Sequence, residues 1–192
     1  MTAAFQDLRR ALAARAPTLF DPGPEGAFAA VALVLAPNAR GELEALLIQR
    51  ARREGDPWSG HVGLPGGRRQ EVDLELFDTA VRETREEVGL GLEQAALLGQ
   101  LDDLAPTTRV RPRLVVRPFA FGIAAQPALA LNHEVERPLW TPLAALRAER
   151  RTSRVRVRDA ELDVPSLQVE GLVLWGMTLR ILDGFLARWG TS

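Results

Sequence analysis

The chain contains no cysteine and no lysine, and these two absences exclude several kinds of chemistry. Without cysteine there is no disulfide scaffold, no cysteine-ligated zinc or iron–sulfur cluster and no thiol nucleophile. Without lysine there is no Schiff-base amine and no P-loop lysine, since all 24 basic residues are arginine. Only two histidines, His61 and His133, are present, which argues against a multi-histidine metal site. Carboxylates are therefore the main chemical resource of the protein.

An excess of charge and a long apolar run are also missing. The 24 basic and 25 acidic residues give a net charge of −1, so no excess positive field attracts the phosphates of nucleic acids. No stretch approaches the roughly 20 apolar residues that span a bilayer, and the N-terminus lacks the regions of a signal peptide. We expect a cytoplasmic protein with a small-molecule substrate and no nucleic-acid or membrane partner. The sequence does not indicate an oligomeric state.

The hydrophobic pattern predicts one mixed α/β (α+β) domain over residues 1–192. Amphipathic helices are expected at residues 3–15, 74–88 and 171–189, and a Pro- and Gly-rich linker ends at residue 26. The predicted strands cover residues 27–36, 43–51, 95–104, 114–123 and 139–141, with a further hairpin over 154–164 and a Pro- and Arg-rich connection over 106–113.

Three glutamates gather at the end of the helix expected at 74–88. Glu83, Glu86 and Glu87 fall within an arc of about 100° beside the apolar stripe, and Gly89 ends the helix. Like charges four residues apart repel one another, and the C-terminal end of a helix disfavours anions. Arg82 can pair with Glu86 but not with all three. A bound Mg²⁺ would resolve this repulsion; the alternative interpretation is a solvated charged face.

These residues resemble the signature of the Nudix hydrolases, in which a glycine and an acidic residue precede R-E-U-x-E-E-x-G-U. Here Gly67 is followed by Arg82-Glu83-x-x-Glu86-Glu87-x-Gly89-Leu90. Fourteen residues separate Gly67 from Arg82, so the early acidic position falls at Leu74, and the neighbouring Asp73 is its substitute and a suitable helix N-cap. The resemblance implies a Nudix-like α/β/α sandwich with a mixed, curved β-sheet and a loop-helix-loop catalytic motif. The Nudix core would cover residues 27–186, after an N-terminal helix and linker at 1–26.

Three further segments are similar to the coenzyme A pyrophosphatase branch of that family. They are Leu46-Leu47-Ile48-Gln49-Arg50-Ala51, Gly60-His61-Val62-Gly63-Leu64-Pro65-Gly66-Gly67 and Glu170-Gly171-Leu172-Val173-Leu174-Trp175-Gly176-Met177-Thr178. An arginine expected between the first two is out of register, and Arg52 or Arg53 could replace it. The resemblance implies cleavage of coenzyme A to 3′,5′-ADP and 4′-phosphopantetheine.

By the same resemblance, Glu83, Glu86, Glu87 and Gly67 belong to a site for Mg²⁺ or Mn²⁺, and Arg82 orients a glutamate. Glu134 is the candidate for a further ligand or the general base, with Glu136 and His133 as alternatives. Arginines near the motif could bind phosphates in pairs of hydrogen bonds; they are Arg50, Arg52, Arg53, Arg68 and Arg69.

Aromatic side chains leave more than one interpretation open. Trp58 could stack on a nucleobase or pack its loop. We expect Trp175 and Met177 to pack the final helix. Two alternatives to coenzyme A cleavage remain at this point: a Nudix hydrolase acting on ADP-ribose, a dinucleoside polyphosphate or a nucleoside triphosphate, and a non-catalytic module that binds a nucleotide or a protein.

Overall fold

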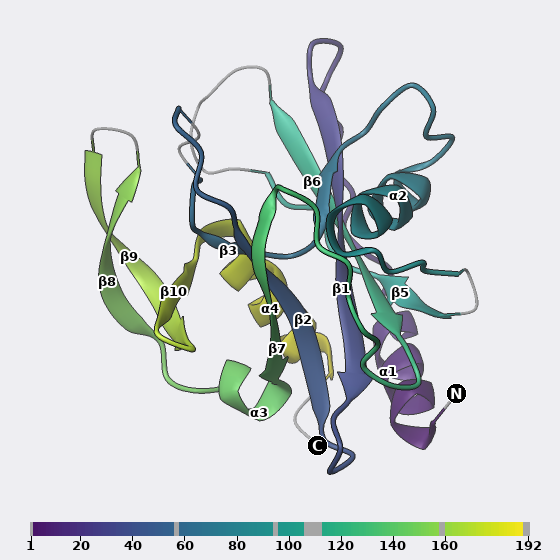
Figure 1. Cartoon of the computed structure of the whole chain (residues 1–192). Helices are drawn as coiled ribbons and strands as arrows, with labels where there is room; N and C mark the ends of the chain where they lie inside the picture. Colours follow the sequence, from purple (N-terminus) through teal and green to yellow (C-terminus); the bar gives the residue numbers. More distant parts are fainter. Residues whose placement is uncertain (1, 56–57, 94–95, 106–112, 158–159, 190–192) are drawn as a thin grey trace.

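A mixed β-sheet forms the centre of the protein in a computed structural model (Figure 1), which describes residues 2–55, 58–93, 96–105, 113–157 and 160–189. The sheet has seven strands: five lie in the order β3-β2-β1-β6-β5, while β4 pairs with β1 and β7 with β2. Among the strands of the described residues, only β1 and β6 pair in parallel. The strands are β1 (Ala27–Pro37), β2 (Leu43–Arg50), β3 (Val62–Gly63), β4 (Gly66–Arg68), β5 (Leu97–Gln100), β6 (Leu114–Gly122) and β7 (Val135–Pro142).

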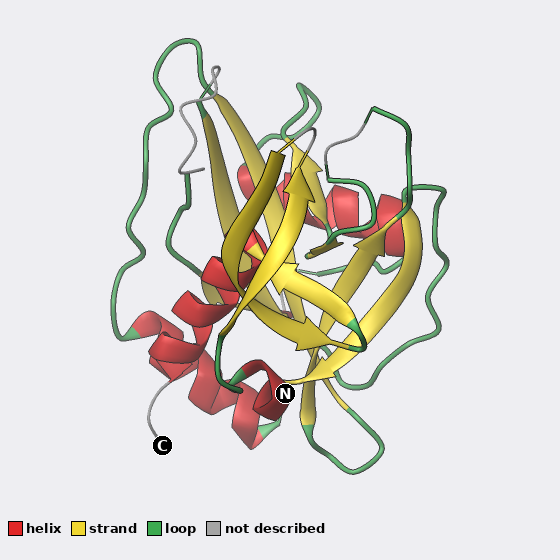
Figure 2. Cartoon of the chain, turned by 90° about the vertical axis from the view of Figure 1, so that its left-hand side faces the viewer, coloured by secondary structure: helices red, strands yellow, loops and turns green. Residues whose placement is uncertain are grey.

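Helices cover both faces of this sheet. Alternate residues of a strand point to opposite faces, and because both sets are apolar in the central strands, both faces are buried. In β1, Leu33 and Leu35 pack in the cluster that contains the buried face of α1 (Ala3–Ala13) and of α4 (Gly176–Trp189). Ala32 and Val34 pack in the second cluster, under α2 (Leu76–Val88). In Figure 2 the strands lie between two groups of helices. The fold is therefore the predicted mixed α+β class, with a curved and unclosed sheet.

A smaller antiparallel sheet lies beside the central one, in the order β10-β9-β8. Its strands are β8 (Arg151–Val157), β9 (Ala160–Val169) and β10 (Leu172–Trp175), and the short helix α3 (Leu143–Leu146) leads into it. The prediction of a helix over 171–189 was wrong for its first residues. Glu170 and Gly171 both have positive φ, at 48° and 80°, which turns the chain so that β10 pairs back on β9. Helix α4 begins only at Gly176.

The N-terminal helix and linker are held on the core by hydrogen bonds. Asp103 is buried, pairs with Arg117 through two bonds of 2.8 Å, and accepts the Phe20 N–H at 2.9 Å. Asp102 accepts the Thr18 N–H at 2.6 Å and the Arg188 Nη2 at 2.6 Å. Among the residues that the structure describes, no helix has both the length and the apolar composition needed to cross a bilayer.

Most of the predicted elements are confirmed, with shifted ends. The hairpin of β1 and β2 and the helix α2 lie where the patterns indicated, and Gly89 ends α2 with a left-handed φ of 71°. The strand expected at 95–104 corresponds to β5, which is shorter, and the strand expected at 139–141 corresponds to β7, which is longer. Residues 106–112 of the expected Arg-rich connection lie outside the described residues.

Candidate active site

The Gly66–Gly67 pair lets the backbone of β4 pass between β1 and α2. A Cβ on Gly66, whose φ is +150°, would lie 2.3 Å from the Ala30 carbonyl oxygen. A Cβ on Gly67 would lie 2.4 to 2.6 Å from the carboxylate of Glu83. Real Cβ atoms do not approach other atoms so closely, so Gly66, which faces backbone atoms, requires glycine, and any side chain at Gly67 would displace the Glu83 carboxylate. The backbone at Gly67 thereby packs directly against the Glu83 carboxylate.

Arg82 organises the acidic end of α2. Its guanidinium binds both oxygens of Asp73, with Nε–Oδ1 at 2.8 Å and Nη2–Oδ2 at 2.9 Å. Its Nη1 donates to Glu83 Oε1 at 2.8 Å and to Glu86 Oε2 at 3.1 Å. Nη2 also donates to the Arg68 carbonyl at 3.1 Å. One guanidinium therefore fixes two of the three glutamates and ties the helix to the preceding loop, as the spacing of Arg82 and Glu86 predicted in part.

The sequence predicted Asp73 as a helix N-cap, and the structure places it elsewhere. It does not cap α2: the N-cap is Glu75, which exchanges hydrogen bonds with Asp78 in a capping box. Asp73 is instead buried and accepts the Gln70 N–H and the Thr79 hydroxyl, each at 2.9 Å. Hydrogen bonds from Arg82 hold the pKa of Asp73 well below its usual range, and the same pairing raises the pKa of Arg82. Asp73 is thus the permanent counter-ion of Arg82.

Glu83 and Glu87 are carboxylates in an environment that disfavours their charge. The side chain of Glu83 is 14% exposed, and its burial raises its pKa. Glu87 is only 2% exposed, and burial, reinforced by the negative charges of Glu83 and Glu134, raises its pKa to about 7. The Gly66 N–H, which donates to Glu87 Oε2 at 2.9 Å, and the charge of Arg50 oppose this shift only in part.

The donor chemistry of this cluster fits a hard divalent cation, since Mg²⁺ and Mn²⁺ prefer carboxylate and carbonyl oxygens. The buried Glu87 and the partly buried Glu83, both with raised pKa values, carry charge that a cation would neutralise, and the backbone at Gly67 packs against Glu83. Within the described ranges, however, no three acidic or histidine side chains converge on one point. In this structure Arg82 binds Glu83 and Glu86, while the Gly66 N–H donates to Glu87.

Glu134, from the loop before β7, lies beside this cluster. Its charge acts on both Glu83 and Glu87. The loop is docked on the end of α2 by two backbone hydrogen bonds, from Asn132 N–H to the Glu87 carbonyl and from Ala130 N–H to the Val88 carbonyl, each at 3.0 Å. The Asn132 side chain also accepts the Glu134 N–H at 2.8 Å. The structure therefore brings the predicted fourth carboxylate to the motif.

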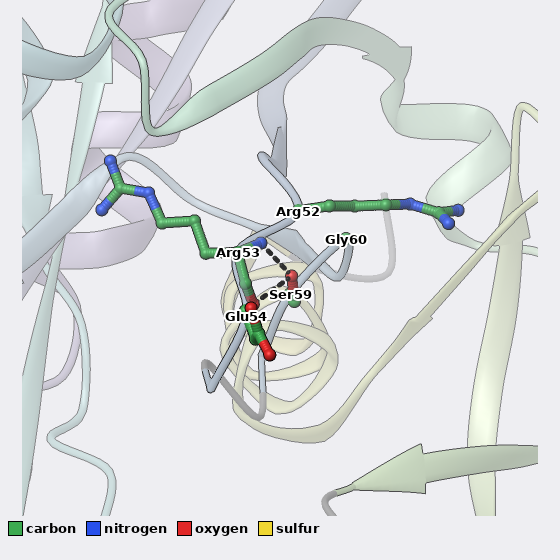
Figure 3. A pocket seen from close by; sticks show the side chains of 5 residues that line it. All are labelled: Arg52, Arg53, Glu54, Ser59 and Gly60. Carbon is green, nitrogen blue, oxygen red and sulfur yellow. Dashed lines mark hydrogen bonds between the residues drawn. The ribbon is translucent and has the colours of Figure 1, made fainter.

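A pocket of about 480 Å³ opens next to Glu134 in the loop between β2 and β3 (Figure 3). Its lining includes Arg52, Arg53 and Ser59, with Glu54 and Gly60. The Ser59 Oγ closes the loop, because it accepts the Arg53 N–H at 2.6 Å and donates to the Arg53 carbonyl at 3.2 Å. The side chains of Arg52 and Arg53 extend in opposite directions from the loop (Figure 3). The Arg53 Nη1 lies 3.2 Å from Glu134 Oε1.

The other candidate arginines are distributed differently. Arg50 acts electrostatically on Glu87. Arg69 uses its guanidinium inside its own loop, donating to the carbonyls of Asp73 and Leu74. Arg68 contributes its carbonyl to Arg82. A phosphate-binding role for these three arginines stays a prediction.

Three aromatic side chains, two of them from the loop that forms the pocket, contact one another. Trp58, which is 50% exposed, has its ring centre 5.9 Å from that of His61 and 6.0 Å from that of Trp175. The rings of His61 and Trp175 are 5.3 Å apart in an edge-to-face arrangement. The expectation that Trp175 packs the final helix was wrong, because it ends β10 and contacts the loop instead.

Comparison with known proteins identifies the family of the chain. Residues 27–160 match the family model of the NUDIX domain. The chain is 31% identical, over 79% of its length and 78% of the relative's, to the uncharacterized Nudix hydrolase NudL of Pectobacterium atrosepticum. It is 41% identical to an uncharacterized protein of Schizosaccharomyces pombe over 58% of the chain, a match that spans only 36% of that relative.

A solved structure supports the same fold. The NUDIX domain of Shewanella oneidensis NrtR, determined with ADP ribose, superposes with a TM-score of 0.61 at 21% identity, over 99% of this chain and all of that one. From the family match over residues 27–160 and the geometry of the α2 motif, the chain belongs to the NUDIX domain family.

Proposed function

We propose that this Nudix hydrolase is a divalent-metal-dependent enzyme that cleaves the diphosphate bond of coenzyme A. Membership of the family makes the chain a pyrophosphatase-type hydrolase. The proposal concerns its metal site, its substrate and the roles of its residues. We also propose that residues 27–186 form the catalytic core and that residues 1–26 are an addition held by Asp102 and Asp103.

Glu83, Glu86, Glu87 and the backbone at Gly67 would hold the Mg²⁺ or Mn²⁺. When bound, the cation would act as a Lewis acid that neutralises charge on the diphosphate and would lower the pKa of a water molecule bound to it. Arg82 keeps Glu83 and Glu86 on the side of α2 that faces β4, and Asp73 keeps Arg82 in place. This arrangement positions the carboxylates before any ligand arrives.

Glu134 is the proposed general base. Its carboxylate is 37% exposed, so water can reach it, and a carboxylate at this place can accept a proton from water attacking a phosphorus atom. Arg52 and Arg53 in the adjoining pocket would bind phosphate oxygens, since guanidinium matches their geometry. Trp58, backed by His61 and Trp175, offers an exposed ring on which a nucleobase can stack.

One observation carries the coenzyme A proposal: the three segments that resemble the coenzyme A branch contact one another at Gly60 and His61, and Gly60 lines this pocket. The first contains Arg50, whose N–H donates to the His61 carbonyl at 3.0 Å and whose carbonyl accepts the Gly60 N–H at 3.1 Å, both in the second segment. The third reaches His61 through Trp175. Segments up to about 120 residues apart thus form a single wall beside the metal motif. A substrate with several phosphates and a base fits the arginines and the aromatic rings together.

The second candidate is another nucleoside diphosphate-linked substrate, such as ADP-ribose. The structural neighbour that covers 99% of this chain was determined with ADP ribose. The arginine pocket and the aromatic rings would serve either compound, because both contain a diphosphate and an adenine.

The test compares initial rates on coenzyme A, ADP-ribose, a dinucleoside polyphosphate and a nucleoside triphosphate, each with Mg²⁺. The proposal expects coenzyme A to have the highest kcat/KM, with 3′,5′-ADP and 4′-phosphopantetheine as products. Phosphorus NMR in oxygen-18 water then identifies the phosphorus that water attacks. Faster turnover of ADP-ribose would replace the coenzyme A proposal with the second candidate. Wild-type turnover in Glu87→Gln would refute the metal site itself.

A further inference from the structure

The ion pair between Arg53 and Glu134 joins two residues to which the proposed function gives separate tasks. Arg53 lines the pocket for phosphates, and Glu134 is the candidate base. We propose that Arg53 restrains Glu134 in the substrate-free enzyme and releases it when a phosphate group of the substrate binds the guanidinium. Arg53 is then a positioning residue that makes the base available only with substrate in place. This inference rests on the proposed function.

Both partners are fixed at the backbone, so only their side chains need to move. Ser59 holds the peptide of Arg53 through two hydrogen bonds, of 2.6 and 3.2 Å. Glu134 is held through its N–H by the Asn132 side chain and through its carbonyl by the Ala51 N–H, each at 2.8 Å. The pair therefore forms across 81 residues of sequence between two anchored loops. A rotation of either side chain is sufficient to break it.

The ion pair between Arg53 and Glu134 is weak enough for a phosphate to replace Glu134 at the guanidinium. The side chains of Arg53 and Glu134 are 41% and 37% exposed, and a single 3.2 Å contact joins them. Ion pairs at this exposure contribute little, because water and salt screen them. A phosphate offers the same guanidinium two parallel hydrogen bonds and more negative charge. Phosphate therefore competes successfully with one carboxylate oxygen for Arg53.

Charge in the substrate-free site explains why a restraint is useful. The negative charge of Glu134 acts on Glu83 and Glu87, which already repel each other. Pairing with Arg53 draws Glu134 toward the pocket and offsets its charge. Once the guanidinium turns to phosphate, the carboxylate is free to meet water or the cation at the motif.

Arg52 provides a matched control on the same loop. It lines the same pocket and carries the same charge, but its stem packs over Gly60, at 3.8 Å from a Cβ built there. Its side chain extends away from that of Arg53 (Figure 3). Replacing Arg52 removes a positive charge from the pocket and leaves the contact between Arg53 and Glu134 in place.

The first experiment measures the affinity of the substrate-free protein for Mn²⁺ by electron paramagnetic resonance. It uses wild type, Arg53→Gln, Glu134→Gln and the double variant. Arg53→Gln should tighten Mn²⁺ binding about threefold to tenfold, and this gain should disappear when Glu134 is also replaced. Arg52→Gln should tighten Mn²⁺ binding by less than Arg53→Gln does, and by the same factor whether residue 134 is glutamate or glutamine. Arg53→Lys, which keeps the positive charge, should have a Mn²⁺ affinity closer to that of the wild type than Arg53→Gln has.

The second experiment titrates the same proteins, without metal and in EDTA, with methylenediphosphonate as a non-hydrolysable diphosphate. Glu134→Gln should strengthen binding about threefold or more when Arg53 is present, and should have no such effect in Arg53→Gln. Equal effects of Glu134→Gln in both backgrounds, or no detectable binding by any variant, would overturn the exchange.

The outcomes separate this inference from the proposed function. Additive effects of Arg53→Gln and Glu134→Gln on Mn²⁺ affinity overturn the restraint, while the metal site and hydrolysis stand. A wild-type protein that binds no Mn²⁺ and hydrolyses none of the diphosphates overturns the proposed function and this inference with it.

Discussion

Replacing Glu87 with glutamine should stabilise the metal-free protein above neutral pH, even though Glu87 belongs to the proposed metal site. Glu87 is 2% exposed and its pKa is raised to about 7, chiefly by burial. The folded protein therefore keeps the proton of Glu87 up to about pH 7, whereas the unfolded chain releases it near the ordinary value of 4.5. Between these two pH values the folded state binds more protons, so the stability of the wild type falls as the pH rises.

The size of the effect follows from the two pKa values. Raising a carboxyl pKa from 4.5 to about 7 corresponds to about 3 kcal/mol of lost stability once the pH is above both values. Glutamine carries no charge, and its side-chain oxygen can still accept the Gly66 N–H that Glu87 accepts at 2.9 Å. The difference in unfolding free energy between Glu87→Gln and wild type should thus shift by about 3 kcal/mol in favour of the variant between about pH 4.5 and pH 8.

Urea denaturation in EDTA at several pH values measures this difference directly. For a chain of this length, about 3 kcal/mol also corresponds to a rise in Tm of roughly 6 to 12 °C relative to wild type near pH 8. Glu86→Gln is the matched control, since Glu86 is 53% exposed and lies one residue away on the same helix. The reasoning is refuted if the free-energy difference between Glu87→Gln and wild type is independent of pH, or if Glu86→Gln changes in the same way.

Three further predictions concern neighbouring residues. Gly67→Ala should reduce Mn²⁺ affinity and turnover at least about tenfold, measured by electron paramagnetic resonance and initial rates, because its Cβ would lie within 2.6 Å of the Glu83 carboxylate. Asp73→Asn should lower the unfolding free energy by about 3 kcal/mol at neutral pH, since it leaves Arg82 without its buried partner. The pKa of Asp73 is lowered in the folded state, so its ionised carboxylate stabilises the fold above the unfolded pKa of about 4, and this stabilisation decreases as the pH falls below about 4. Urea curves in which Asp73→Asn loses as much unfolding free energy at about pH 2.5 as at neutral pH would contradict this. Trp58→Leu should raise KM for coenzyme A about fivefold or more with little change in Tm, because the indole is 50% exposed and lies outside the buried core; an unchanged KM would exclude stacking on the base.

Local patterns in the sequence predicted the helices and hairpins well where a single periodicity governs a segment. The apolar spacing of residues 3–13 and 76–88, and the turn between β1 and β2, act within about ten residues, so the backbone follows them. The same approach failed at residues 172–175. There the apolar residues suit a strand as well as a helix, and the pairing with β9 selected the strand.

The sequence by itself determined the carboxylate motif of this protein: the spacing of Glu83, Glu86 and Glu87 on one helix, the stop at Gly89, and an arginine able to reach part of the cluster. Helical geometry alone requires these features. Tertiary structure decided the rest. Burial in the folded protein raised the pKa of Glu87, and folding of the loop turned Asp73 from an expected cap into the counter-ion of Arg82.

The same holds for contacts between distant segments. Folding brought Glu134 to Arg53 and Trp175 to Trp58. Local periodicity contains no information about such contacts, because they depend on how the sheet orders its strands and on which groups are thereby removed from water.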